Sequence, residues 1–120
     1  MTFNVEIVLR GRDFAVTDVV NIEHGLPAAW DEAAARDALK GILRAIYRAE
    51  HPSAPADPTV VLQGFSWIVE PSEGRVVIAI ELPSGAAVAG PFDADQATLD
   101  ALIARVLRTE RQMAAPTTVH

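Results

Sequence analysis

Two Glu-His pairs are the residues of this sequence best suited to chemistry. Glu23-His24 precedes a Gly-Leu-Pro stretch, and Glu50-His51 precedes Pro52. A carboxylate beside an imidazole can transfer protons or bind a metal ion, which makes each pair a candidate for acid–base or metal chemistry. The pairs bracket a predicted helix of about 20 residues, whose ends lie about 30 Å apart. One chain therefore cannot place both pairs around one ion, and the sequence predicts neither a metal site nor a cofactor.

Each pair also has a structural interpretation, which the sequence favours. His51 would lie at the C-terminus of the helix, where the macrodipole favours a cationic imidazole. Glu23 and His24 would lie in a turn beside Gly25 and Pro27, where polar side chains solvate the backbone. Trp30 would then pack on the turn that precedes the helix. The alternative is a ligand pocket at this corner, with four candidate contacts: Glu23, His24, Trp30 and Tyr47.

Other motifs point away from catalysis. The Gly-Phe-Ser-Trp-Ile run at 64–68 lacks the final glycine of a nucleophile elbow and lies inside a strand pattern. Cysteine is absent, which excludes disulfides, thiolate metal sites and a cysteine nucleophile. No phosphate loop, dinucleotide fingerprint or zinc-protease motif occurs in the sequence. The sequence therefore predicts no catalytic residues.

A row of basic residues runs along the first predicted helix, at a spacing of four: Arg36, Lys40, Arg44 and Arg48. Such a row could bind an acidic partner or a phosphate backbone. Acidic residues gather at the start of the same helix, however, and the macrodipole favours that arrangement. The row is therefore interpreted as a solvated helix face. With a net charge of −6, the chain is predicted not to bind nucleic acid.

Hydrophobic periodicity predicts the elements that position these residues. Alternation at period two indicates strands, and spacing of three to four residues indicates helices. The second helix is predicted to begin after Asp93, with Gln96 completing a capping box. The predicted strands span 3–9, 14–22, 59–69, 76–82 and 87–92, and the predicted helices span 31–51 and 93–112. The order ββαβββα predicts a two-layer α+β fold: a mostly antiparallel sheet with both helices on one face.

Length and composition predict one small domain. The chain has 120 residues, of which 50% are hydrophobic, and this suits a single domain over 1–112 with a flexible C-terminal tail over 113–120. The first residues lack the pattern of a signal peptide, and no stretch reaches the ~20 apolar residues of a membrane helix. Together with the lack of cysteine, these features predict a cytoplasmic protein that does not bind membranes.

The predicted strand 59–69 suggests a partner. It places Val61, Phe65, Trp67 and Val69 on one face, and apolar residues at 60, 62 and 68 on the other. Because helices cover one side of a two-layer sheet, a partly apolar second face needs another cover, and a symmetric partner is the commonest one. The leading hypothesis is a non-catalytic interaction or accessory protein, homodimeric, with Phe65, Trp67 and Val69 near the seam. The alternative is a small-molecule binder or acid–base enzyme with a pocket near Glu23-His24.

Overall fold

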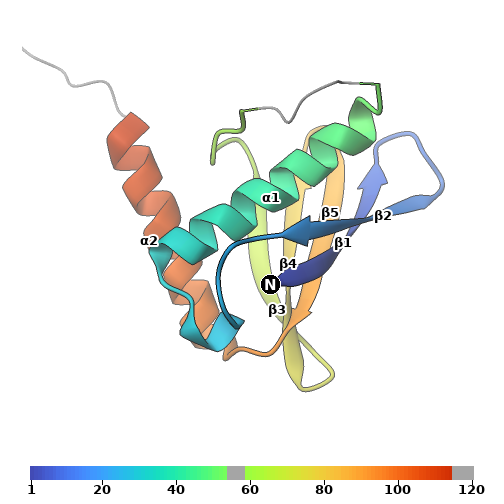
Figure 1. Cartoon of the computed structure of the whole chain (residues 1–120). Coiled ribbons are helices and arrows are strands. Elements are labelled where there is room, and N and C mark those ends of the chain that lie inside the picture. Colours follow the sequence, from blue (N-terminus) through green and yellow to red (C-terminus); the bar gives the residue numbers. More distant parts are fainter. Residues whose placement is uncertain (54–58, 115–120) are drawn as a thin grey trace, which may run out of the picture.

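The predicted element order is confirmed by the structure, a computed structural model that describes residues 1–53 and 59–114 (Figure 1). A single 3-10 turn, η1 (Pro27–Ala29), adds to the predicted elements. The strands are β1 (Thr2–Leu9), β2 (Ala15–Asn21), β3 (Ser66–Ser72), β4 (Arg75–Leu82) and β5 (Gly85–Phe92), and the helices are α1 (Glu32–Glu50) and α2 (Gln96–Ala114).

The five strands form one antiparallel sheet in the order β2-β1-β5-β4-β3. β5 is therefore the central strand, and β2 and β3 are the edges. α1 crosses the sheet and packs against β2, β1 and β5, whereas α2 packs against β3 and α1 (Figure 1). Both helices lie on the same face of the sheet, which confirms the predicted two-layer α+β fold.

The core lies between the helices and the inner face of the sheet. In β1 every second residue is buried, and the register with β2 and β5 extends this alternation across the sheet. Phe92 at the end of β5 is 1% exposed and meets two other rings edge to face: Phe3 at 5.0 Å and Trp30 at 5.4 Å between centroids. This aromatic cluster joins the sheet to the chain segment that leads into α1.

Two glycines permit close approaches in this core. Gly41 lies where α1 crosses β2, and a Cβ at that position would overlap the Cγ1 of Val20. Gly90 has a φ of 118°, which favours glycine, and it lies opposite an irregularity in the pairing of β4 with β5. Regular alternation would place Phe92 on the opposite face from buried Ala89, because two residues separate them instead of one. The irregularity brings Phe92 back to the inner face.

The start of α2 corrects the predicted cap. Asp95, rather than Asp93, caps the helix: its Oδ2 accepts hydrogen bonds from the Thr98 backbone N–H at 3.0 Å and from the Thr98 hydroxyl at 2.8 Å. These bonds lower the pKa of the Asp95 carboxyl from its usual value of 3.8. Gln96 does not complete a capping box either, since its side-chain amide donates to the backbone carbonyl of Val69 at 2.9 Å.

The predicted strand at 59–69 is the largest error in the sequence-based fold. β3 begins only at Ser66, because the chain turns before it: the Gln63 N–H donates to the Val61 carbonyl, and Gly64 has a φ of 79°. Leu62 lies in this loop, and its side chain is buried in the core with 5% of its surface exposed. At the other end, α2 continues to Ala114, two residues into the predicted tail, while 115–120 lie outside the described residues.

Candidate functional site

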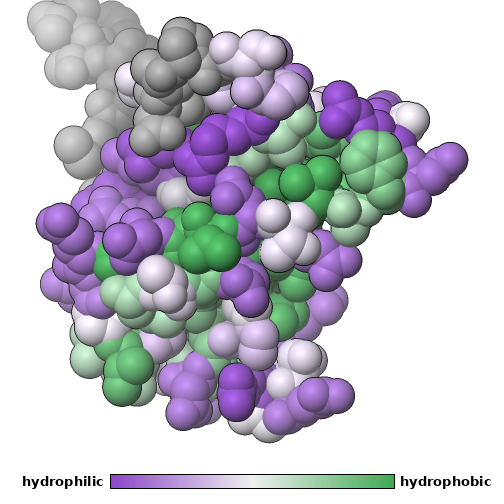
Figure 2. Space-filling view, turned by 45° about the vertical axis from the view of Figure 1, so that its right-hand side comes forward, coloured by the Kyte–Doolittle hydropathy of each residue, from purple (hydrophilic) through white to green (hydrophobic). Residues whose placement is uncertain are grey.

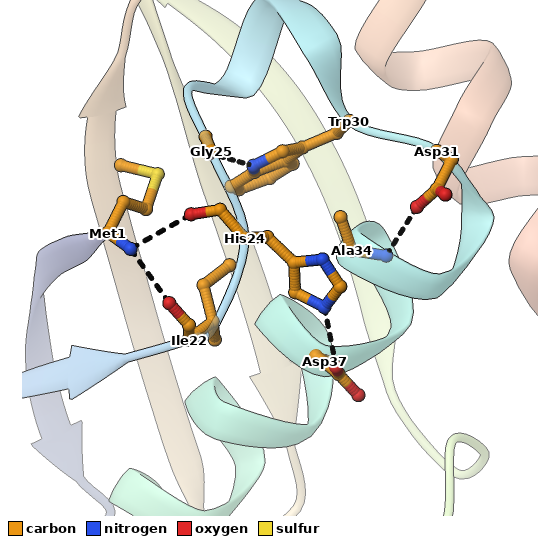
Figure 3. A network of polar contacts seen from close by, with 8 residues as sticks. All are labelled: Met1, Ile22, His24, Gly25, Trp30, Asp31, Ala34 and Asp37. Atoms are coloured by element: carbon orange, nitrogen blue, oxygen red, sulfur yellow. Dashed lines mark hydrogen bonds and ion pairs between the residues drawn. The ribbon is translucent and has the colours of Figure 1, made fainter.

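The corner between β2 and α1 is held by hydrogen bonds to its own backbone (Figure 3). The amino group of Met1 donates to the carbonyl oxygens of Ile22 at 2.7 Å and of His24 at 2.9 Å. The Trp30 indole N–H donates to the carbonyl of Gly25 at 2.9 Å, and the ring itself is buried against Phe92. These contacts fix the path of the loop from the sheet to the helix.

His24 meets a carboxylate, but not the one beside it in the sequence. Its Nε2 lies 2.8 Å from Oδ2 of Asp37, which projects from the second turn of α1 (Figure 3). The His24 side chain is 25% exposed and that of Asp37 is 54% exposed, so water reaches the pair. A pair of this kind can orient an imidazole for proton transfer. Neither Glu23, His24 nor Trp30 contributes to the walls of four hollows found elsewhere on the described residues.

Tyr47 lies away from this corner. Ten residues of helix separate it from Asp37, which corresponds to about 15 Å along α1. Its ring lies beside that of His51, with 4.4 Å between centroids, and His51 Nε2 lies 3.7 Å from a carboxylate oxygen of Glu50. The two Glu-His pairs are thus at opposite ends of α1, as the helix length requires. The four candidate contacts do not form one site, and a ligand role for any of them stays a prediction.

The basic row of α1 is tied into the fold at both ends. Arg36 Nε donates to Glu110 of α2 at 2.5 Å, and the Arg48 guanidinium donates to Asp18 of β2 at 2.9 and 3.2 Å. The side chains of both ion pairs, Arg36–Glu110 and Arg48–Asp18, are partly shielded from solvent. Arg36 and Arg48 therefore bridge α1 to α2 and β2, a role that the sequence analysis missed because both acidic partners are distant in sequence.

Two of the three predicted seam residues, Trp67 and Val69, lie on the covered face of the sheet. Trp67 and Val69 pair with Ile80 and Ile78, whose side chains are buried beneath the helices. Val69 is itself only 2% exposed, so its side chain has almost no surface to offer a partner, which argues against a place for this residue at the seam. Phe65 precedes β3 and is partly exposed.

A cavity lies where the loop before β3 faces the last turns of α2. Its volume is about 320 Å³. Leu62 forms its buried floor, and Phe65 and Trp67 contribute half-buried rings. The α2 side supplies an apolar wall and two charges: Leu107, Glu110 and Arg111. The cavity combines aromatic surface with charged groups. The sequence analysis missed this cavity because the loop before β3 was predicted to be a strand.

The outer face of the sheet is the second candidate surface. We use this name for the side chains that alternate away from the helices, of which four large apolar ones are about half exposed: Val8, Val19, Ile68 and Val88. Ala79 and Ala86 lie between the larger side chains of β3 and β5 and leave a hollow of about 310 Å³. Both described helices lie on the opposite side of the sheet (Figure 1).

Other exposed apolar residues lie apart from this face: Phe14, Leu26, Tyr47 and Val61. On the side drawn in Figure 2, hydrophobic residues form separate patches among hydrophilic ones. Over the described part of the chain, no group of three or more histidine and acidic residues is arranged to bind a metal ion. Neither α1 nor α2 is long and apolar enough to cross a membrane.

Comparisons with protein-family models, with curated proteins and with solved structures gave no match to this chain.

Proposed function

We propose that this chain is a non-catalytic interaction protein that works as a homodimer, with the outer sheet face as the seam. The observation that carries the proposal is a set of four half-exposed branched residues on that face, Val8, Val19, Ile68 and Val88, of which Ile68 and Val88 flank Ala79 in the strand register. Exposed apolar patches of this kind mark association sites in soluble proteins. The predicted cytoplasmic location belongs to the same proposal, because it still rests on the sequence alone.

The size of the outer face suits a second copy. Strands of seven or eight residues give a length of about 25 Å, and five strands give a width of about 24 Å. Two such faces together bury about 1,200 Å², at the lower end of the range for specific interfaces. Two twisted sheets also pack face to face at a small angle without distortion.

The shape of the outer face suits pairing with an identical face, because it has both projecting side chains and a hollow. A two-fold interface brings the same patch of both subunits together, so it needs projections and hollows within one patch. Ile68 and Val88 project, and the hollow at Ala79 and Ala86 lies between them. A partner's valine or isoleucine can therefore occupy the hollow.

The charges on the face also suit a copy of the same chain. Glu6, Glu70 and Glu81 lie within it by alternation, and Arg10 lies at its rim in the same shallow hollow as Glu81. Burying a carboxylate is costly unless a cation meets it. A second copy brings its own Arg10, which offsets one of these acids, while Val8 and Val88 supply the apolar centre. This is the usual anatomy of an apolar core within a polar rim.

The proposal is tested by sedimentation equilibrium on the intact chain and on Val88→Glu. We expect the intact chain to sediment at twice its chain mass of 12.9 kDa. A carboxylate at the centre of the seam should weaken the dimer about 100-fold or more, because it is desolvated without a partner.

Leu26→Glu is the matched control. Leu26 is an even more exposed apolar residue, at 73%, but it lies in the loop before η1, outside the outer face. This variant should keep the dimer mass. A monomer mass for the intact chain at millimolar concentration contradicts the proposal. A dimer that survives Val88→Glu and dissociates with Leu26→Glu instead would place the seam elsewhere.

A further inference from the structure

We propose that the cavity between the loop before β3 and the end of α2 binds a small aromatic carboxylate. None of its lining residues lies on the outer sheet face, so the inference goes beyond the proposed dimer and does not depend on it. The argument rests on an incomplete cover over β3, on an exposed guanidinium at the cavity and on its size.

The cover over β3 is incomplete at the beginning of the strand. Trp67 and Val69 share the inner face, and Val69 is 2% exposed beneath α2. Trp67 is only half buried, although it points to the same side. An inward-facing indole that keeps exposed surface leaves room for another flat group, and Phe65 provides a second ring in the same cavity. The cavity therefore favours an aromatic ligand.

The charges at the cavity favour an anion. Glu110 is occupied by Arg36, whose Nε donates to it at 2.5 Å. The adjacent Arg111 is exposed, and none of the described residues pairs with it. Because Glu110 is held by Arg36 across the helix pair, the exposed guanidinium of Arg111 is the charged group at the cavity that can meet an anion. A guanidinium binds a carboxylate with two parallel hydrogen bonds, which makes a carboxylate the ligand group that fits best.

The size of the cavity sets the scale of the ligand. Its volume of about 320 Å³ is at the lower end of the range for small-molecule sites. It suits one or two fused rings with a short acidic group rather than a nucleotide or a long peptide. Leu62 and Leu107 provide the apolar contacts that exclude water from the edges of such a ring.

The test is an NMR titration of the intact chain with 2-naphthoate, followed through the indole N–H signals of its two tryptophans. Trp67 lines the cavity, whereas Trp30 is bonded to Gly25 at the far corner and reports that the fold is intact. We expect a saturable shift of the Trp67 signal and no shift of the Trp30 signal. The neutral amide of the same ring should bind about tenfold more weakly, since it loses one charge-assisted contact.

Arg111→Gln should weaken binding of 2-naphthoate about tenfold for the same reason. Arg108→Gln is the matched control, since Arg108 lies on the same helix but does not line the cavity, and it should bind with unchanged affinity. Three results would each overturn the proposal: an unmoved Trp67 signal at millimolar 2-naphthoate, equal affinity for the acid and the amide, or unchanged binding by Arg111→Gln with the Trp30 signal in place.

Discussion

The two faces of the sheet differ in how completely the chain covers them. On the inner face, Val5, Ile7 and Ile78 are at most 1% exposed beneath the helices. On the outer face, Val8 and Val88 are both 45% exposed although they lie on the same strands or their neighbours. Because hydrophobic burial scales with the area removed from water, the inner face stabilises the monomer, and the outer face keeps the apolar surface that the proposed dimer would bury.

The largest difference between the faces should appear in stability. Phe92→Ala on the inner side should lower the free energy of unfolding by about 3–5 kcal/mol, because it empties the centre of the aromatic cluster. Val19→Ala on the outer face should cost less than about 1 kcal/mol, since Val19 is 56% exposed on an edge strand. Urea unfolding at equal protein concentration measures both changes. Similar losses for the two variants would show that the outer face is structural in the monomer.

A smaller effect tests how closely α1 approaches the sheet. Alanine normally stabilises a helix relative to glycine, by about 1 kcal/mol. Gly41→Ala should instead destabilise the protein by about 1–3 kcal/mol, because the new methyl overlaps Val20. Adding Val20→Ala should recover part of that loss by making room. If Gly41→Ala alone raises the midpoint of thermal unfolding, α1 lies farther from β2 than the structure places it.

At the corner before α1, a substitution of Trp30 should lower the stability of the protein more than a substitution of His24. Trp30→Phe keeps a ring against Phe92 but removes the hydrogen bond to Gly25, which should cost about 1 kcal/mol. His24→Gln removes a half-exposed pair with Asp37 and should cost less than that. Thermal unfolding of the two variants gives the comparison. The reverse order would mean that the His24–Asp37 contact, and not the buried indole, holds the corner.

The smallest expected effect concerns the cap of α2. Asp95→Ala should lower the thermal midpoint slightly, and Asp93→Ala should leave it unchanged, because only Asp95 bonds to Thr98. The Asp95 pKa is lowered in the folded state, so its contribution is complete above the unfolded value of 3.8 and is lost as pH falls through the lower folded value. The difference between Asp95→Ala and the parent chain should therefore shrink in acid; a constant difference from pH 7 to pH 2 would contradict this account.

The sequence predicts the elements better than the contacts between them. Alternation in β1 and the helical stripe of α1 are local signals, and both were placed within about two residues. The strand prediction was wrong for residues 59–65 because an apolar loop and a buried strand have similar sequences. The side chain of Leu62 is buried in the core, although Leu62 does not belong to the sheet. Trp67 and Val69 were correctly placed on one face, but alternation alone does not say which face the helices cover.

The candidate sites depended on contacts that no local pattern contains. Arg36 bonds to Glu110, which lies 74 residues later in the chain, and this pairing follows from the packing of α1 beside α2. His24 meets Asp37 rather than Glu23, because the loop folds back over the second turn of the helix. The cavity beside Trp67 joins a loop to α2 in the same way. Each of these arises only when distant elements come together.

The most direct test of the central claim is an isotope-filtered NMR experiment on a mixture of labelled and unlabelled chains. If the outer sheet face pairs with a second copy, methyl groups of Val8, Ile68 and Val88 should show contacts between chains, and those of buried Ile7 and Ile78 should show none. A concentrated sample in which the outer-face methyls contact only their own chain would contradict the account.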